Sequence, residues 1–159
     1  MKQKTLAVLM KIAVVLMGVV GVVCFADLIP VMGKDIVLKY PEFDYFYLPW
    51  LIFLEILAIP YFFVMVLGWL VASEISKDNS FSFVNAKRIK MAAIATMSAS
   101  IYFFAGNIVL ALASLSHPGV LLASFIVDFI GVAFSIGFAM LSHLILKAAE
   151  LQKQNDLTI

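Results

Sequence analysis

Four long apolar stretches constrain this chain more than any other feature of its sequence. They cover residues 12–29, 48–71, 91–115 and 120–146, and each approaches or exceeds the roughly 20 mostly apolar residues that a helix needs to cross a bilayer. Backbone N–H and C=O groups in lipid need partners within their own segment, so all four stretches are expected to be helices. The sequence therefore predicts an all-α membrane protein with a single domain over residues 1–159.

Composition excludes several classes of protein. Apolar residues make up 64% of the chain and charged residues 13%, against about half and a quarter in an ordinary soluble domain. A net charge of +1 provides no field to attract nucleic acid, so no direct nucleic-acid partner is expected. The single cysteine, Cys24, excludes an internal disulfide. The sequence contains no HExxH, phosphate-loop or GxSxG motif, so we expect neither an enzyme nor a bound cofactor or metal.

Basic residues predict the orientation in the membrane. Nine of the eleven lie in the N-terminal segment, the connection 72–90 and the tail 147–159, and the other two, Lys34 and Lys39, lie between the first two spans. Because Lys and Arg favour the cytoplasmic side, both termini are expected in the cytoplasm. The first stretch is long for a signal peptide and is expected to remain as a span. The four spans would form a compact antiparallel four-helix bundle.

The two sides of the membrane differ in character. Residues 30–47 are expected to form an acidic and aromatic outer loop, either an interfacial belt or a ligand-binding rim. Pro49 is expected to open the second span at its first turn. On the inner side, Ser82 is a plausible N-cap for a helix that runs into the third span. The basic cluster that follows it has two interpretations, contact with anionic lipid and docking of a cytoplasmic partner.

Small residues predict how the spans pack. In the fourth span, one face combines small residues with one carboxylate: Ser124, Asp128, Gly131, Ser135, Ala139 and Ser142. In the third span, the corresponding face holds Ala92, Ala95, Ala99, Tyr102, Gly106 and Ala113. Small residues allow helices to approach closely in lipid, so these two faces are expected to pack against each other.

A few polar residues inside the spans need a physical explanation. Asp128 lies about ten residues into the fourth span, where an unpaired carboxylate costs several kcal/mol. It is either a cation, proton or ligand site or a structural carboxyl between helices. Glu55, Asn107 and Asp27 share its outer half of the membrane, and with Tyr102 they are hypothesised to line one acidic pocket. Pro60 is expected to kink the second span near Glu55.

Two short motifs resemble a known family. Phe81-Ser82 followed by 85–90, and the ending 151–159, are similar to the YoaS-like family of small bacterial four-span membrane proteins, a domain of unknown function. The resemblance implies a regulatory partner, because such proteins are often encoded beside a very small helix-turn-helix regulator. Both motifs map to the predicted cytoplasmic side, which suggests a docking surface made of Phe81, Ser82, Lys87, Arg88, Asn155, Asp156 and Leu157. Leu157 and Ile159 would pack near Phe81 and Phe83.

Three functions follow as hypotheses. The first is a sensor or regulatory partner of a small helix-turn-helix transcription regulator, responding to the membrane or to a lipophilic or cationic ligand. The second is a transporter or channel subunit that uses Asp128 and Glu55 as a homo-oligomer. The third is an immunity protein that binds a membrane-active peptide through its outer loop.

Overall fold

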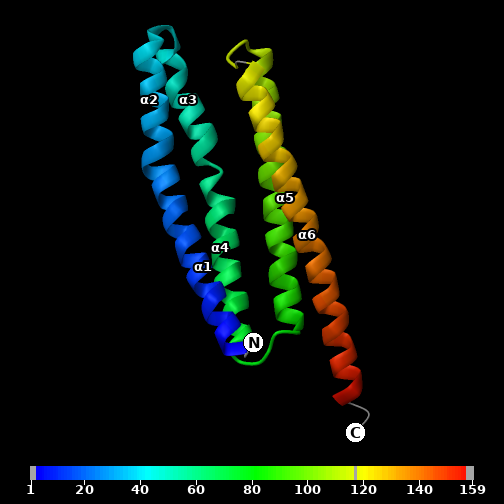
Figure 1. Ribbon diagram of the computed structural model, residues 1–159. Coiled ribbons are helices and arrows are strands. Elements are labelled where there is room, and N and C mark those ends of the chain that lie inside the picture. Colours follow the sequence, from blue (N-terminus) through cyan, green and yellow to red (C-terminus); the bar gives the residue numbers. More distant parts are fainter. Residues whose placement is uncertain (1–2, 117, 157–159) are drawn as a thin grey trace.

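The computed structural model describes residues 3–116 and 118–156, and every regular element in this part of the chain is helical (Figure 1). Within these residues, four helical segments are long and apolar enough to cross a membrane. The predicted all-α fold is thus confirmed. In chain order the elements are α1 (Gln3–Val23), the π turn η1 (Cys24–Leu28), α2 (Ile29–Lys39), the 3₁₀ turn η2 (Pro41–Phe43), α3 (Asp44–Glu55), α4 (Ala58–Ile75), α5 (Phe83–Leu112) and α6 (Pro118–Asp156).

The helices are longer than the hydrocarbon layer is thick. The 39 residues of α6 span about 58 Å at 1.5 Å per residue, whereas the hydrocarbon core measures about 30 Å. Helical structure therefore continues into regions that the sequence assigned to loops and tail. The predicted outer loop 30–47 is wrong: α2 and α3 occupy most of it, and only residues 40–43 separate these two helices.

A π turn carries the first helix past a proline. Pro30 has no N–H to donate to a preceding carbonyl, which would interrupt a regular α-helix. In η1 the N–H of Ile29 instead donates to the carbonyl of Cys24, five residues earlier. Such a wider turn absorbs the lost bond without ending the helix, so α1, η1 and α2 form one continuous rod.

Pro60 breaks the second helix, as predicted. Because proline cannot donate to the carbonyl of Ile56, that carbonyl accepts a shorter-range bond from the N–H of Ile59 at 3.2 Å. The N–H of Leu57 likewise bonds three residues back, to Leu54, at 3.0 Å. The result is the interruption between α3 and α4. Pro49, by contrast, lies in the interior of α3, so its predicted place at a helix start is wrong.

The helices contact one another in chain order. α1 packs on α4, α4 on α5, and α5 most extensively on α6, whereas α1 and α6 share no extensive contact within the described residues. The bundle is therefore open between its first and last helices, not closed as a compact bundle would be. In Figure 1 the described N-terminal and C-terminal ends lie at the same end of the helices as the connection 76–82.

Aromatic side chains fill the places of missing Cβ atoms at three helix contacts. The ring of Tyr61 on α4 lies against Gly21, and Phe53 on α3 lies against Gly106. Tyr47 and Trp50 cover Gly33 in the same way. Without a hydrophobic force between helices in lipid, such close packing is a main source of helix association.

The α5–α6 contact is a seam of small buried residues spaced seven apart. Ser142 Oγ donates to the carbonyl of Ala86 at 2.7 Å, and Ser135 Oγ donates to that of Ala93 at 2.8 Å. The face predicted on the fourth span is confirmed by the burial of Ser124, Asp128, Ser135 and Ser142, although Ala139 is exposed.

The face of small residues predicted on the third span packs mainly against α3 and α4, not against α6. Ala95, Ala99 and Tyr102 line a groove shared with α4, and Gly106 contacts Phe53 of α3. The residues of α5 that meet α6 lie on a neighbouring face, including Ala86, Ala93 and Ser100. The expected pairing of the two small faces is wrong, because α5 has two partners and uses a different face for each.

We expect Gly21→Ala to destabilise the protein, because the added Cβ would overlap the ring of Tyr61. Overpacking costs about 1–3 kcal/mol, against a gain of up to about 1 kcal/mol in helix propensity. Gly18→Ala is the matched control, because no atom lies within 4 Å of its added Cβ. Thermal unfolding in detergent should give a lower midpoint for Gly21→Ala alone, and equal midpoints would contradict the packing described.

Candidate functional site

Asp128 is buried on α6 without a hydrogen-bond partner among the described residues. Its residue surface is 8% exposed, and neither carboxylate oxygen has a hydrogen-bond partner in the described chain. The ion pairs found among the described residues do not involve it. Leaving a charge unpaired in a membrane interior costs several kcal/mol, so this carboxyl needs a proton or a cation.

The register of the seam explains what Asp128 faces. Each step of seven residues from Ser142 to Ser135 on α6 matches a step of seven from Ala86 to Ala93 on α5. The next step places Asp128 level with Ser100, and the neighbouring Gly131 contacts the Ser100 hydroxyl. Ser135 and Ser142 each donate an O–H to a backbone carbonyl of α5. A charged carboxylate has no proton to donate there, whereas a neutral carboxyl does.

A cavity of about 320 Å³ lies beside Asp128, where η1, α4, α5 and α6 meet. Aromatic rings from three elements line it: Phe25 from η1, Tyr61 from α4 and Phe103 from α5. Most of the remaining lining is aliphatic, with the hydroxyls of Thr96 and Ser100 among it. The arrangement places one acidic group in the wall of a mostly apolar space.

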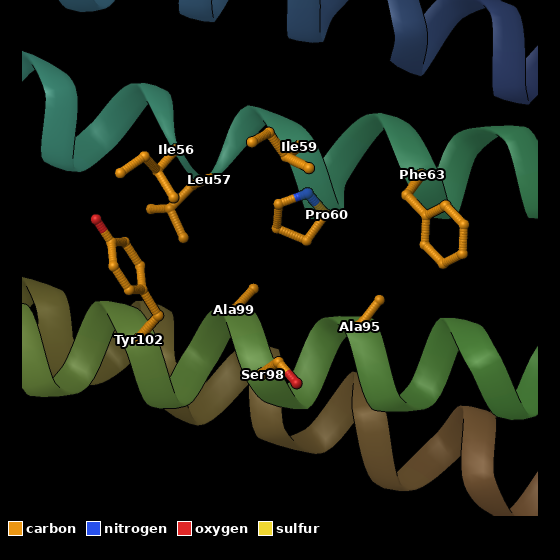
Figure 2. A pocket seen from close by; sticks show the side chains of 9 residues that line it. All are labelled: Ile56, Leu57, Ile59, Pro60, Phe63, Ala95, Ser98, Ala99 and Tyr102. Atoms are coloured by element: carbon orange, nitrogen blue, oxygen red, sulfur yellow. The ribbon is translucent and has the colours of Figure 1, made fainter.

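A second groove, of about 330 Å³, lies between the α3–α4 break and α5 (Figure 2). Its outer wall includes Ile59, which is 71% exposed, and Phe63. Leu57, Pro60 and Ala99 line this groove and also the Asp128 cavity. The two spaces therefore adjoin at these shared side chains, and the break caused by Pro60 borders both.

The other predicted polar residues do not line the Asp128 cavity. Glu55 ends α3 and is half-buried, with Oε1 lacking a partner. Asn107 is buried and donates from Nδ2 to the carbonyl of Phe103 at 2.8 Å. Asp27 is exposed on η1. Tyr102 lines the groove of Figure 2 and donates its hydroxyl to the carbonyl of Phe53 at 3.2 Å.

Sequence reasoning did not identify the aromatic lining of the cavity. Phe25 and Tyr61 lie 5.8 Å apart between ring centroids, although they belong to different spans. The hydroxyl of Tyr61 donates to the carbonyl of Met17 at 2.7 Å, which holds the ring in place. The position of Tyr61 directly after Pro60 is a signal that the sequence does contain, since a kink exposes space beside it.

A polar network organises the connection between α4 and α5. Ser82 is the N-cap of α5, as predicted, and its Oγ accepts from the N–H of Asn85 at 3.2 Å. Asn85 is 1% exposed and donates from Nδ2 to the carbonyls of Asn79 and Ser80 at 3.1 and 3.2 Å. These bonds hold the connection against the first turn of α5.

The predicted docking residues have different roles in this region. Arg88 donates to the carbonyl of Leu70 on α4 at 3.1 Å and lies 3.9 Å from the carboxylate of Glu74. It therefore ties α4 to α5. Phe81 is 57% exposed, and Lys87 is exposed, so both are accessible to a partner.

The predicted docking residues at the end of the chain are only partly described. Asn155 is exposed on the last turn of α6, and Asp156 ends that helix. Leu157 and Ile159 lie outside the described residues, as does their expected contact with Phe81 and Phe83.

We expect Arg88→Ala to destabilise the protein by about 1–3 kcal/mol, because it removes hydrogen bonds from a charged donor to a partly buried helix contact. Lys87→Ala is the control: it removes an exposed cation from the same helix turn and should change stability by less than about 0.5 kcal/mol. Thermal unfolding midpoints in detergent compare the two variants. A greater loss for Lys87→Ala would contradict the assigned roles.

Comparison with known proteins places the chain in a family. Residues 31–159 match the family described as "Protein of unknown function (DUF2975)". The chain is also 25% identical to the uncharacterized membrane protein YoaS of Bacillus subtilis (strain 168) over 154 residues, which cover 96% of each chain. No solved structure matches it significantly. The resemblance to the YoaS-like family is thus confirmed, and the chain, a multi-pass membrane protein, belongs to the family DUF2975.

Proposed function

We propose that this protein is a non-enzymatic sensor of the bacterial plasma membrane and the regulatory partner of a small helix-turn-helix transcription regulator. In this proposal the four spans run antiparallel, with both termini in the cytoplasm. The membrane interior receives the signal at Asp128, and the cytoplasmic end passes it on. The concentration of basic residues at the end that carries the connection 76–82 supports this orientation.

One observation carries the proposal: an unpartnered carboxyl lies where two helix pairs meet, α1 with α4 and α5 with α6. Asp128 on α6 lines the same cavity as Tyr61 on α4 and Phe25 on η1, so a change in its charge state acts on contacts between both pairs. A ligand shifts a conformational equilibrium only if it interacts differently with the two states. A group whose burial depends on a proton or cation meets that requirement.

The α4–α5 connection offers a route from the cavity to the cytoplasmic end. Both helices line the cavity, and both enter the network around Arg88, which bonds Leu70 of α4 and the side chain of Asn85. A shift between α4 and α5 would reach the exposed Phe81 and Lys87 through these bonds. These two residues and the tail from Asn155 onward form the proposed docking surface.

A crosslinked pull-down of the tagged protein from native membranes, followed by mass spectrometry, tests the partner. We expect recovery of a small helix-turn-helix protein, and loss of that recovery when residues 155–159 are deleted or Lys87 is changed to Gln. Lys4→Gln is the control, because it removes an exposed cation from the N-terminal helix. Equal recovery from all variants, or no regulator from the intact protein, would contradict the proposal.

Transport by a homo-oligomer is the second candidate, and the unpartnered oxygens of Asp128 and Glu55 favour it. Acidic groups inside a membrane protein commonly mark the pathway of a transported cation. If this candidate holds, Asp128→Asn should abolish the flux of cations into proteoliposomes. The pull-down with the intact protein should then recover no regulator. Recovery of only further copies of this chain in the pull-down would also favour transport.

A further inference from the structure

We propose that the Asp128 cavity binds an organic ammonium ion with an apolar body, which reaches it from the bilayer through the groove of Figure 2. The inference deepens the proposed sensing role by naming the class of ligand, and it rests on that role. It follows from three observations: the lining of the cavity, the missing partner of Asp128, and the side chains that the cavity shares with the groove.

The lining matches the chemistry that recognises an ammonium ion. Such cations bind over the faces of aromatic rings, which are negative, and gain further from one opposite charge nearby. Phe25, Tyr61 and Phe103 provide rings from three elements, and Asp128 provides the charge. The volume of about 320 Å³ falls at the lower end of the range for small-molecule sites.

The rings are held in place before any ligand binds. Tyr61 is fixed by its bond to the carbonyl of Met17 and by contact with Gly21. Phe103 stacks on Phe53, with centroids 6.0 Å apart and planes inclined by 9°. A site that needs little ordering on binding loses less affinity to entropy. The rotation of the Asp128 carboxylate from the seam toward the ligand changes only side-chain torsions.

The same lining disfavours a metal ion. Ca²⁺ and Mg²⁺ need several oxygen ligands, and softer metals need imidazole or thiolate groups. The described chain contains no group of three His, Cys, Asp or Glu side chains able to hold a metal. The Thr96 hydroxyl already donates to the carbonyl of Ala92. One carboxylate among aromatic rings therefore fits an organic cation better.

The groove of Figure 2 explains why the ligand should be lipophilic. Ile59 and Phe63 lie at its exposed side, on a surface that faces lipid in a membrane protein. Leu57, Pro60 and Ala99 line both this groove and the Asp128 cavity, so the two spaces adjoin there. A cation with an apolar body can enter the bilayer and reach the cavity from the groove. A hydrated ion would need far more free energy to enter the hydrocarbon.

Binding of benzyltrimethylammonium to the full chain in lipid nanodiscs tests the inference. We expect saturable binding by equilibrium dialysis and a rise of the thermal unfolding midpoint, since a ligand of the folded state stabilises it. Asp128→Asn should weaken binding roughly tenfold or more, because it removes the charge inside a low-dielectric site. Asp27→Asn is the matched control, because it makes the same change at an exposed position outside the cavity lining and should bind normally.

Two further measurements keep the test decisive. Phe25→Leu retains an apolar side chain but removes a ring, so it should weaken binding even if Asp128→Asn fails to fold. Neopentylbenzene, which has the same shape without the charge, should bind wild type and Asp128→Asn equally. The inference is overturned if benzyltrimethylammonium does not bind wild type, or if it binds Asp128→Asn or Phe25→Leu as well as wild type.

The outcome is distinguishable from failure of the proposed function. Binding of the cation without capture of a regulator would retain the site and favour transport. Capture of a regulator without binding of the cation would retain the regulatory role and overturn the ligand class.

Discussion

Close approach of helix backbones is the constraint on which this structure depends. In lipid, apolar surfaces gain little by meeting each other, so helices associate where small residues allow tight packing and hydrogen bonds. The described chain meets this requirement with Gly21 beneath Tyr61, with Gly106 beneath Phe53, and with serine hydroxyls that bond carbonyls across the α5–α6 seam. Each contact joins a different pair of helices. The helices therefore pack one after another, and the bundle stays open between α1 and α6.

Asp128 departs from the pattern of its own seam. Ser135 and Ser142 satisfy the equivalent positions with a hydroxyl that donates to α5, whereas a charged carboxylate cannot donate. Because Asp128 stands where a serine donor would repeat, the stability of this position in the seam depends on a bound proton or cation. Because the cavity and the break at Pro60 lie beside it, a change in the charge of Asp128 acts next to space that side chains leave unfilled.

Much of the fold could be predicted from residue patterns, and the candidate site only in part. The four helices, the break at Pro60, the Ser82 cap and the buried face of α6 follow from hydrophobicity, missing donors and local hydrogen bonding. Local patterns did not predict that helix would replace the loop 30–47, because the π turn that lets the first helix pass Pro30 is a property of the surrounding backbone.

By itself, the sequence determined that the chain is all-helical, that it has four segments able to cross a membrane, and that Asp128 would be costly inside them. Only the tertiary structure decided what surrounds that carboxyl. Small residues on α5 permit close packing on two faces, and sequence periodicity cannot say which neighbour each face meets. The contact between Phe53 and Gly106 on one face, and the bonds from Ser135 and Ser142 to the other, settle that choice, because both need the α5 backbone to lie close to its partner.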